Sequence, residues 1–302
     1  MHSILLIFLD GIGIGENNPE INPFFRYPFK SFTDIFGETP SLNAQYLHSS
    51  GNDKFIFPSD ARLGIEGLPQ SGTGQTSIFC GVNAPKLIGQ HFGPYPYSTL
   101  IPVIKEKNIF REFIDREEKV AFANAYPQIF FDYVNSGKQR LSVTTLSCRL
   151  SGLRLNNYED LKNGNALSPE IDNSRWVNKL GYDLPIISPE LAAERLLKIA
   201  SLNKLTVFEY FLSDHLGHHR NFDTLQKTLE CLDRFLFHIL TTLDTDISLL
   251  VCSDHGNLED ISVKMHTLNP ALTVSAGKYA AEFAERITDI SQIKPLIMEL
   301  TK

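Results

Sequence analysis

Cysteine is scarce in this sequence and forms no paired motif. The four cysteines lie far apart and make no CxxC pair; they are Cys80, Cys148, Cys231 and Cys252. This spacing disfavours a disulfide framework, which needs cysteines in regular pairs. We therefore expect reduced, partly buried thiols and a reducing compartment.

An excess of basic residues and a long hydrophobic run are also missing. The chain has 28 basic against 35 acidic residues, a net charge of -7 and a pI near 5.7, so a nucleic-acid partner is disfavoured. The longest apolar run near the start, Ile4 to Leu9, stops at Asp10. It is too short for a membrane span or a signal sequence. These properties predict a cytoplasmic protein with no nucleic-acid or membrane partner.

What remains is the composition of an ordinary globular protein. Hydrophobic residues make up 42% and charged residues 21% of the 302 residues, which excludes a disordered tail and a fibre. A chain of this length forms one large domain or two ordinary ones and can bury a sizeable core.

Short apolar segments that each end in a turn recur along the chain. The first is SILLIFL at 3–9, before DGIGIG, and the later ones are 119–127, 204–214 and 246–256. Such runs are typical of buried parallel strands. Helices are predicted between them, at 100–115, 189–202 and 223–243. The alternation predicts an α/β fold with a mostly parallel sheet sandwiched by helices.

Residues 126–186 break this alternation. The segment is rich in Asn, Ser and Gly and has no clear helical period. We expect residues 1–125 and 187–302 to form the core, with 126–186 as a small inserted cap or a long excursion.

Metal-capable side chains stand at or just after the ends of the predicted strands: Asp10, Asp214, His218, Asp254, His255 and His266. Ligands of open α/β sheets bind at this edge. One helical turn would place His218 on the same face as Asp214, and a hairpin would return His266 to the site. Carboxylate and imidazole ligands without cysteine suit Mn²⁺ or Zn²⁺. Two such ligand sets would form a two-metal site for phosphoryl transfer.

The glycine-rich segment LPQSGTGQTSIFCG at 68–81 offers a nucleophile to such a site. Gly72 and Gly74 let the backbone approach a phosphate, and the N-terminus of the following helix would attract the anion. Three hydroxyls compete for the role: Ser71, Thr73 and Thr76. The other glycine-rich segment, GIGIG at 11–15, is no dinucleotide fingerprint, because its third glycine falls at the wrong offset.

Together these motifs resemble the alkaline phosphatase superfamily, in particular the metalloenzyme branch that holds cofactor-independent phosphoglycerate mutase and phosphopentomutase. FLDGIGIG at 8–15 is similar to the first-strand Asp and glycine-rich loop of the phosphopentomutases. SDHLGH at 213–218 is similar to a family segment with metal ligands at both ends. SDHGN at 253–257, with HT-x-N at 266–269, is similar to the last ligand cluster, and the order along the chain also matches.

The resemblance implies a role for each of these residues. One metal would be held by Asp10, Ser71, Asp254 and His255, and the other by Asp214, His218 and His266. It also implies Ser71 as the nucleophile, because Ser71-Gly-Thr-Gly is similar to the mutases' Ser-Glu-Val-Gly and Gly81 follows ten residues later. Thr73 is the alternative. The DHGN form points to Mn²⁺, with Zn²⁺ as the second choice.

The resemblance implies a function for the chain as well. A small cap leaves the site open to water, which favours hydrolysis. We therefore expect a phosphomonoesterase that forms a phosphoserine on a small phosphorylated metabolite. A phosphomutase and a non-catalytic protein that binds metal and a phosphorylated ligand are the alternatives. The sequence carries no signal for the oligomeric state. Substrate contacts are expected from basic residues: Lys86, His91, Arg140, Arg149 and Arg154.

Overall fold

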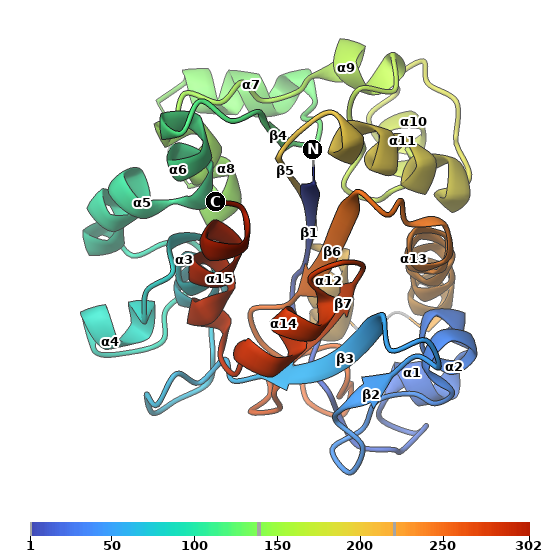
Figure 1. Ribbon diagram of the computed structural model, residues 1–302. Coiled ribbons are helices and arrows are strands. Elements are labelled where there is room, and N and C mark those ends of the chain that lie inside the picture. The colour runs from blue at the N-terminus through green and yellow to red at the C-terminus, as the bar shows by residue number, and fades with distance from the viewer. Residues whose placement is uncertain (1, 138–139, 220–221) are drawn as a thin grey trace.

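A seven-stranded sheet lies at the centre of the computed structural model, which describes residues 2–137, 140–219 and 222–302 (Figure 1). The strands are β1 (Ser3–Leu9), β2 (Leu47–His48), β3 (Lys54–Ser59), β4 (Val120–Phe122), β5 (Leu205–Tyr210), β6 (Ile247–Cys252) and β7 (Ala271–Ala276). Their order across the sheet is β2-β3-β7-β6-β1-β5-β4. Helices cover both faces, so the predicted α/β class is confirmed.

The sheet has a parallel half and an antiparallel half. β1 pairs in parallel with β5 and β6, and β4 extends this half beside β5. β7 runs antiparallel to β6, and β3 and β2 follow, also antiparallel. The sheet is therefore mixed. The parallel strands are the ones found from the sequence, because β1, β5 and β6 are buried along their whole length.

The helices of the described residues vary from four to 21 residues in length. They are α1 (Pro23–Arg26), α2 (Lys30–Phe36), α3 (Ser71–Cys80), α4 (Ala84–Ile88), α5 (Ile101–Lys107), α6 (Ile109–Asp115), α7 (Gln128–Asn135), α8 (Val143–Leu150), α9 (Tyr158–Lys162), α10 (Ser174–Asn178), α11 (Pro189–Ser201), α12 (Leu212–His219), α13 (Phe222–Thr242), α14 (Ala280–Arg286) and α15 (Ile293–Leu300). None of the helices in this part of the chain combines the length and the apolar character needed to cross a membrane.

The helix predicted over 100–115 is two helices in the structure. Asn108 ends α5 and caps α6, and its side chain accepts a hydrogen bond from the Arg111 backbone N–H. Asn favours such cap positions because its short side chain replaces the missing backbone partner. The hydrophobic period runs on through the break, so the pattern alone predicted one helix.

Side chains of β1 alternate between two cores, one on each face of the sheet. The odd-numbered residues from Leu5 to Leu9 pack in the core that holds α2, α11 and α13. The even-numbered residues from Ile4 to Phe8 pack in the core that holds α3, α5, α6 and α15. Figure 1 shows α11 and α13 on one side of the sheet and α3 and α15 on the other. Burial on both faces fixes the register of β1 and therefore the place of the loop after it.

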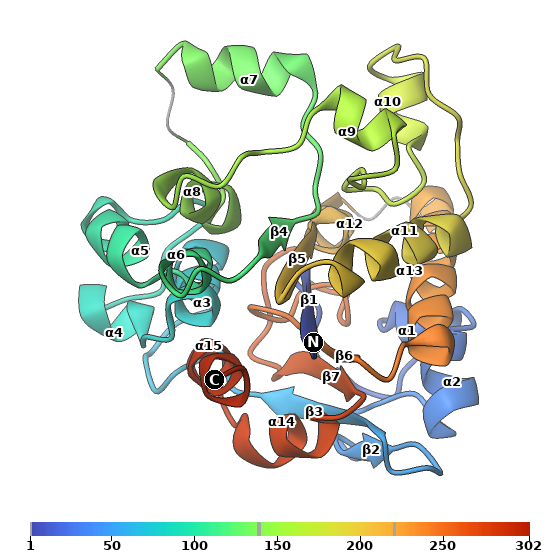
Figure 2. The same ribbon diagram turned by 45° about the horizontal axis from the view of Figure 1, so that its top comes forward.

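The segment 126–186 contains the short helices α7 to α10, of five or eight residues each. Helices of one or two turns leave little periodic signal, which explains the missing pattern in the sequence. Figure 2 shows α7, α9 and α10 beyond β4, at the edge of the sheet. A small cluster around Trp176 has its own buried residues. By contrast, α8 packs against α3, α5 and α6, so part of the segment is continuous with the core.

Candidate metal centre

Three elements of the parallel half bring acidic side chains to one place. Asp10 directly follows β1, Asp254 lies two residues after β6, and Asp214 lies in the first turn of α12. Because β5, β1 and β6 are neighbours, their carboxyl ends meet at one edge. The strand predicted to reach Asp214 ends at Tyr210 instead. As expected, His218 shares a helix face with Asp214, with its Nε2 3.3 Å from Asp214 Oδ2.

Ser71 is the first residue of α3 and lies against this acidic cluster. Its Oγ is 3.0 Å from His255 Nε2. A Cβ at Gly72 would overlap a neighbouring backbone carbonyl, and one at Gly74 would lie 2.9 Å from Asp254 Cβ. Gly74 therefore lets the start of α3 approach Asp254, which follows β6, and Gly72 lets it approach the loop at Phe92 and Tyr95.

The other two candidate hydroxyls face backbone atoms. Thr73 Oγ1 donates a hydrogen bond to Gln70 O and accepts one from the Phe92 N–H. Thr76 Oγ1 donates to the carbonyl of the preceding helical turn. Of the three hydroxyls, Ser71 is the one that contacts a member of the metal-capable cluster.

Asp10, Asp254 and His255 form the first candidate metal group. Their ligand atoms all lie within 4.8 Å of one another. His255 Nε2 is 3.4 Å from Asp10 Oδ1 and 3.5 Å from Asp254 Oδ2. These two carboxylate oxygens are buried and accept no hydrogen bond from the described residues. Buried acceptors need a partner, and this set of oxygens, imidazole and the nearby Ser71 hydroxyl suits a divalent cation.

Asp214, His255 and His266 form the second candidate group. His266 Nε2 is 3.5 Å from Asp214 Oδ1, and the rings of His255 and His266 stack with centroids 3.7 Å apart. The sequence assigned His218 to this group and His255 to the first group only. In the structure His255 belongs to both groups, and His218 contacts Asp214 from its more exposed side.

Two backbone carbonyls orient the imidazoles around Asp214. His266 Nδ1 lies 2.7 Å from Pro69 O, and His218 Nδ1 lies 2.7 Å from Lys264 O. A hydrogen bond at Nδ1 leaves Nε2 as the atom that faces the carboxylate. Such outer hydrogen bonds fix the ring orientation of imidazole metal ligands.

Without a bound cation, the ionised form of the buried carboxylates in this cluster is unfavourable. Burial raises the pKa of Asp10 well above its ordinary value, and repulsion from Asp254 adds to the shift. Burial and the charge of Asp214 raise the pKa of Asp254 to about 7. Burial lowers the pKa of His255 to about 3. Burial also opposes ionisation of Asp214, yet hydrogen bonds from neighbouring imidazoles hold its pKa below its ordinary value. Bound divalent cations favour the ionised carboxylates and reverse this balance.

Glu259 supports the centre and was missed in the sequence. It is fully buried and accepts hydrogen bonds from the backbone N–H groups of Gly13 and Asn257, both at 2.8 Å, and from Thr267 Oγ1. It therefore ties the loop after β1 to the turn after β6 and to the segment that carries His266. The available signal was an acidic residue two positions after Asn257, in DHGNLED.

Comparisons with known proteins match part of this chain. The family model described as the metalloenzyme superfamily matches residues 187–302, which include Asp214, Asp254 and His266. The 2,3-bisphosphoglycerate-independent phosphoglycerate mutase of Mycoplasmoides gallisepticum is 28% identical over 126 residues, 39% of this chain and 25% of that protein. The same enzyme of Legionella pneumophila (strain Corby) is 33% identical over 87 residues, 26% of this chain and 16% of that protein.

Solved structures share the fold over the whole chain. An alkaline phosphatase from the Antarctic bacterium TAB5 has a TM-score of 0.56 and 14% identity, and the match covers 99% of this chain and 98% of that one. A protein from Pyrococcus horikoshii has a TM-score of 0.57 and 12% identity over 99% and 97% of the two chains. The chain is therefore similar to the metalloenzyme superfamily over residues 187–302, and its fold is similar to that of the alkaline phosphatase given above. The matched stretches span only a quarter or less of the two phosphoglycerate mutases.

The candidate metal centre opens into a cavity of about 520 Å³. Asp10, Ser71 and Asp214 line it together with Arg140 and Glu209. Arg140, one of the predicted substrate contacts, thus lines the same cavity as Ser71.

The other four predicted substrate contacts lie elsewhere. Arg149 lines a neighbouring cavity. Lys86 is exposed on α4, and His91 Nε2 lies 3.3 Å from the Ile65 carbonyl oxygen. Arg154 forms a bidentate ion pair with Asp160, in which its Nη1 and Nη2 lie 2.8 and 2.7 Å from the two carboxylate oxygens. Lys86, His91 and Arg154 do not line the cavities around the metal centre, so no structural feature supports them as substrate contacts.

Glu209 is a buried acid that the sequence analysis did not single out. It is the second-last residue of β5, pairs with Phe8 of β1 and faces the cavity of the metal centre. Burial raises its pKa to about 7, and the charge of Asp254 adds to the shift. The strand signal was a mainly apolar run, and a single acid within such a run does not indicate a site.

We expect the raised pKa of Glu209 to make the stability of the metal-free protein depend on pH. Because the pKa of Glu209 is raised in the folded state, its contribution is present below about pH 4.5 and is lost as the pH rises to about 7. The wild type should therefore lose stability relative to Glu209→Gln by up to about 1.4 kcal/mol per pH unit across this window. Urea unfolding of both proteins with chelator at pH 5, 6 and 7 measures the difference. A difference independent of pH would contradict the assignment.

Proposed function

We propose that this chain hydrolyses phosphate monoesters through a phosphoserine at Ser71. The observation that carries the proposal is the position of Ser71 Oγ, 3.0 Å from His255 Nε2, at the N-terminus of α3. His255 is the residue that the two candidate metal groups share. The nucleophile, both groups and the positive end of a helix therefore meet at one point.

Two divalent cations at these groups would lower the pKa of the Ser71 hydroxyl and stabilise charge on the leaving oxygen. We propose that Asp10, Ser71, Asp254 and His255 hold one, and that Asp214, His266 and His218 hold the other. Mn²⁺ fits this set of carboxylates and imidazoles, and Zn²⁺ is the alternative. The carboxylates by themselves would repel a phosphate group.

In the proposed reaction, the start of α3 binds the phosphate and Ser71 attacks it. The N-terminus of α3 attracts the oxygens of the phosphate and orients them beside Ser71. The bond between Ser71 Oγ and phosphorus forms while the bond to the ester oxygen breaks, and the alcohol leaves with a proton. Water then cleaves the phosphoserine, which releases phosphate and restores the hydroxyl. Positioning and charge stabilisation account for most of the catalysis in such a transfer.

A phosphomutase is the second candidate function. It is favoured by the sequence relatives, because the two with the matches given above are phosphoglycerate mutases. In this case a second hydroxyl of the same substrate, in place of water, takes the phosphoryl group from Ser71. We propose that the segment 126–186 acts as the small cap over the site and decides between the two acceptors by the water that it admits.

The test is an assay of phosphate release from a panel of phosphorylated metabolites with Mn²⁺, and with chelator as control. We expect release that stops with chelator and returns when Mn²⁺ is restored. Phosphorus NMR of the same samples detects positional isomers. Isomers without free phosphate would establish the mutase. Neither product, in a protein that binds Mn²⁺, would contradict both enzymatic functions and favour a binding protein.

A further inference from the structure

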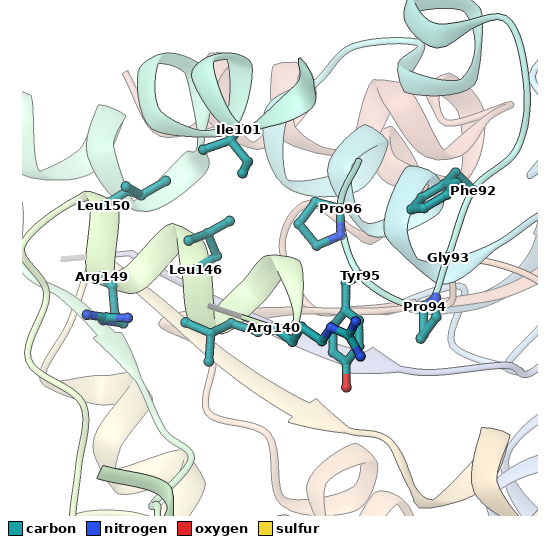
Figure 3. Close-up of a pocket in the computed structure, with 11 residues that line it drawn as sticks. Phe92, Gly93, Pro94, Tyr95, Pro96, Ile101, Arg140, Leu146, Arg149 and Leu150 are labelled. Atoms are coloured by element: carbon teal, nitrogen blue, oxygen red, sulfur yellow. The ribbon is translucent and has the colours of Figure 1, made fainter. Parts of the chain in front are cut away.

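An apolar cavity of about 770 Å³ lies beside the cavity of the metal centre (Figure 3). We call it the side chamber. One wall is the loop from Phe92 to Pro96, and the opposite wall is formed by Ile101 at the start of α5 and by Leu146 and Leu150 of α8. Figure 3 shows Ile101, Leu146 and Leu150 directed toward the space between these walls. Volumes of this size are typical of pockets that enclose an organic ligand.

The side chamber adjoins the cavity of the candidate metal centre. Both are lined by Pro94, Tyr95, Arg140 and Leu141, and Ser71 lines the cavity of the metal centre. In the loop between the two cavities, Phe92 packs edge-on against Tyr97 with ring centroids 4.9 Å apart. A phosphate bound beside Ser71 can therefore extend its organic group past Tyr95 into the side chamber.

The charge of the side chamber suits an anionic ester. Its lining contains no acidic residue and two arginines, Arg140 and Arg149, both exposed. Neither guanidinium has an acidic partner among the residues that the structure describes, whereas Arg154 of the same segment pairs with Asp160. Tyr95 is 41% exposed, although its ring borders both cavities. An unpaired cation beside an uncovered aromatic ring is an arrangement that binds an apolar anion.

We propose that the side chamber binds the organic group of the substrate, that this group is aromatic or similarly bulky and apolar, and that Arg140 binds the phosphate at the boundary. The proposal rests on the function proposed above and names its substrate class. A three-carbon metabolite would leave the side chamber empty, and its polar hydroxyls would gain nothing from Ile101 and Leu146. The apolar walls therefore separate this site from one built for a small polar phosphate ester.

Binding of two phosphonates to the Mn²⁺-loaded protein tests the proposal. Methylphosphonate and 1-naphthylphosphonate carry the same anionic group, resist hydrolysis and differ in the apolar part. We expect the naphthyl compound to bind about ten- to a hundredfold more tightly in calorimetry, since burial of an aromatic ring contributes free energy of this order. Equal affinity of the wild type for the two compounds would overturn the proposal.

Variants of the chamber walls locate the binding site of the naphthyl group. Leu146→Trp and Ile101→Trp fill the chamber from different walls and should each reduce the preference to below about threefold, with methylphosphonate binding unchanged. Arg140→Ala should weaken the binding of both phosphonates by a similar factor. Leu87→Trp, on the exposed surface of α4, is the matched control and should keep the full preference. If Leu146→Trp and Ile101→Trp fold, as judged by circular dichroism, and both keep the preference, the proposal is wrong.

Phosphate release from 1-naphthyl phosphate separates this proposal from the proposed function. Preferential phosphonate binding without release would contradict the hydrolase and support the side chamber as a binding site. Release without any preference would contradict the role of the side chamber and support the hydrolase.

Discussion

Replacement of Ser71 by alanine is expected to reduce turnover by roughly a thousandfold or more, while the fold and the other proposed ligands of the first metal remain in place. The hydroxyl is the atom that we place in covalent contact with phosphorus, and Ser71 Oγ is the hydroxyl at the start of α3 that contacts His255. Its methylene is held in a buried position that alanine can occupy. The measurement is the rate of phosphate release with Mn²⁺, together with acid-quench trapping of the phosphoprotein, which should form in the wild type and not in the variant.

Thr73→Ala is the matched control for this experiment. Thr73 lies on the same helix, was the alternative nucleophile, and its hydroxyl bonds Gln70 O and the Phe92 N–H. We expect Thr73→Ala to lose some stability, about 1 kcal/mol for the two hydrogen bonds, and to keep turnover within a few fold. Loss of the trapped phosphoprotein in Thr73→Ala, and its survival in Ser71→Ala, would reverse the assignment.

Replacement of Asp254 by asparagine is expected to change stability in opposite directions with and without metal. At pH 8 with chelator the variant should be more stable by about 1–3 kcal/mol, because it removes a buried charge beside Asp10 and Asp214. With saturating Mn²⁺ the order should reverse. The wild type gains about 2.7 kcal/mol when free ion exceeds its dissociation constant a hundredfold, whereas the variant lacks one ligand. Thermal unfolding with chelator and with Mn²⁺ measures both effects, and turnover should fall by roughly a thousandfold.

Asp233→Asn distinguishes this result from a general effect of losing a buried acid. Asp233 is buried far from the metal centre and accepts hydrogen bonds from the backbone N–H groups of Lys30 and Ser31 at the start of α2. Its replacement should destabilise the protein with or without metal, and the response to Mn²⁺ should be that of the wild type. An Asp254→Asn protein that is destabilised with chelator and still stabilised by Mn²⁺ would contradict the metal assignment.

The two outcomes together would link the stability of this protein to its chemistry. A cluster of buried carboxylates costs stability until cations neutralise it, and the same cations prepare the site for a phosphate. The side chamber would in addition select substrates by their organic group. In this proposal the candidate metal centre carries out the phosphoryl transfer, and the loop at Tyr95 together with α8 at Leu146 binds the organic group of the substrate.

The sequence by itself determined the parallel strands and the residues at their ends. β1, β5 and β6 are buried on both faces, so each appears as a mainly apolar run, and the first acidic residues after the runs are Asp10, Asp214 and Asp254. The antiparallel edge was not predictable in the same way. β2 has two residues, and β3 contains Pro58 and is partly exposed, so neither gives a strong local pattern.

The tertiary structure alone decided which of these side chains lie together at the candidate site. Only packing in three dimensions shows that His255 lies within reach of both candidate metal groups, that Glu259 joins three loops, and that Glu209 faces the cavity from inside a strand. It also separates Arg140, which lines the site, from Arg154, which Asp160 holds elsewhere. Local sequence patterns report burial and chain direction, because these act over a few residues. Distances between side chains far apart in the chain depend on how the helices and loops pack around the sheet.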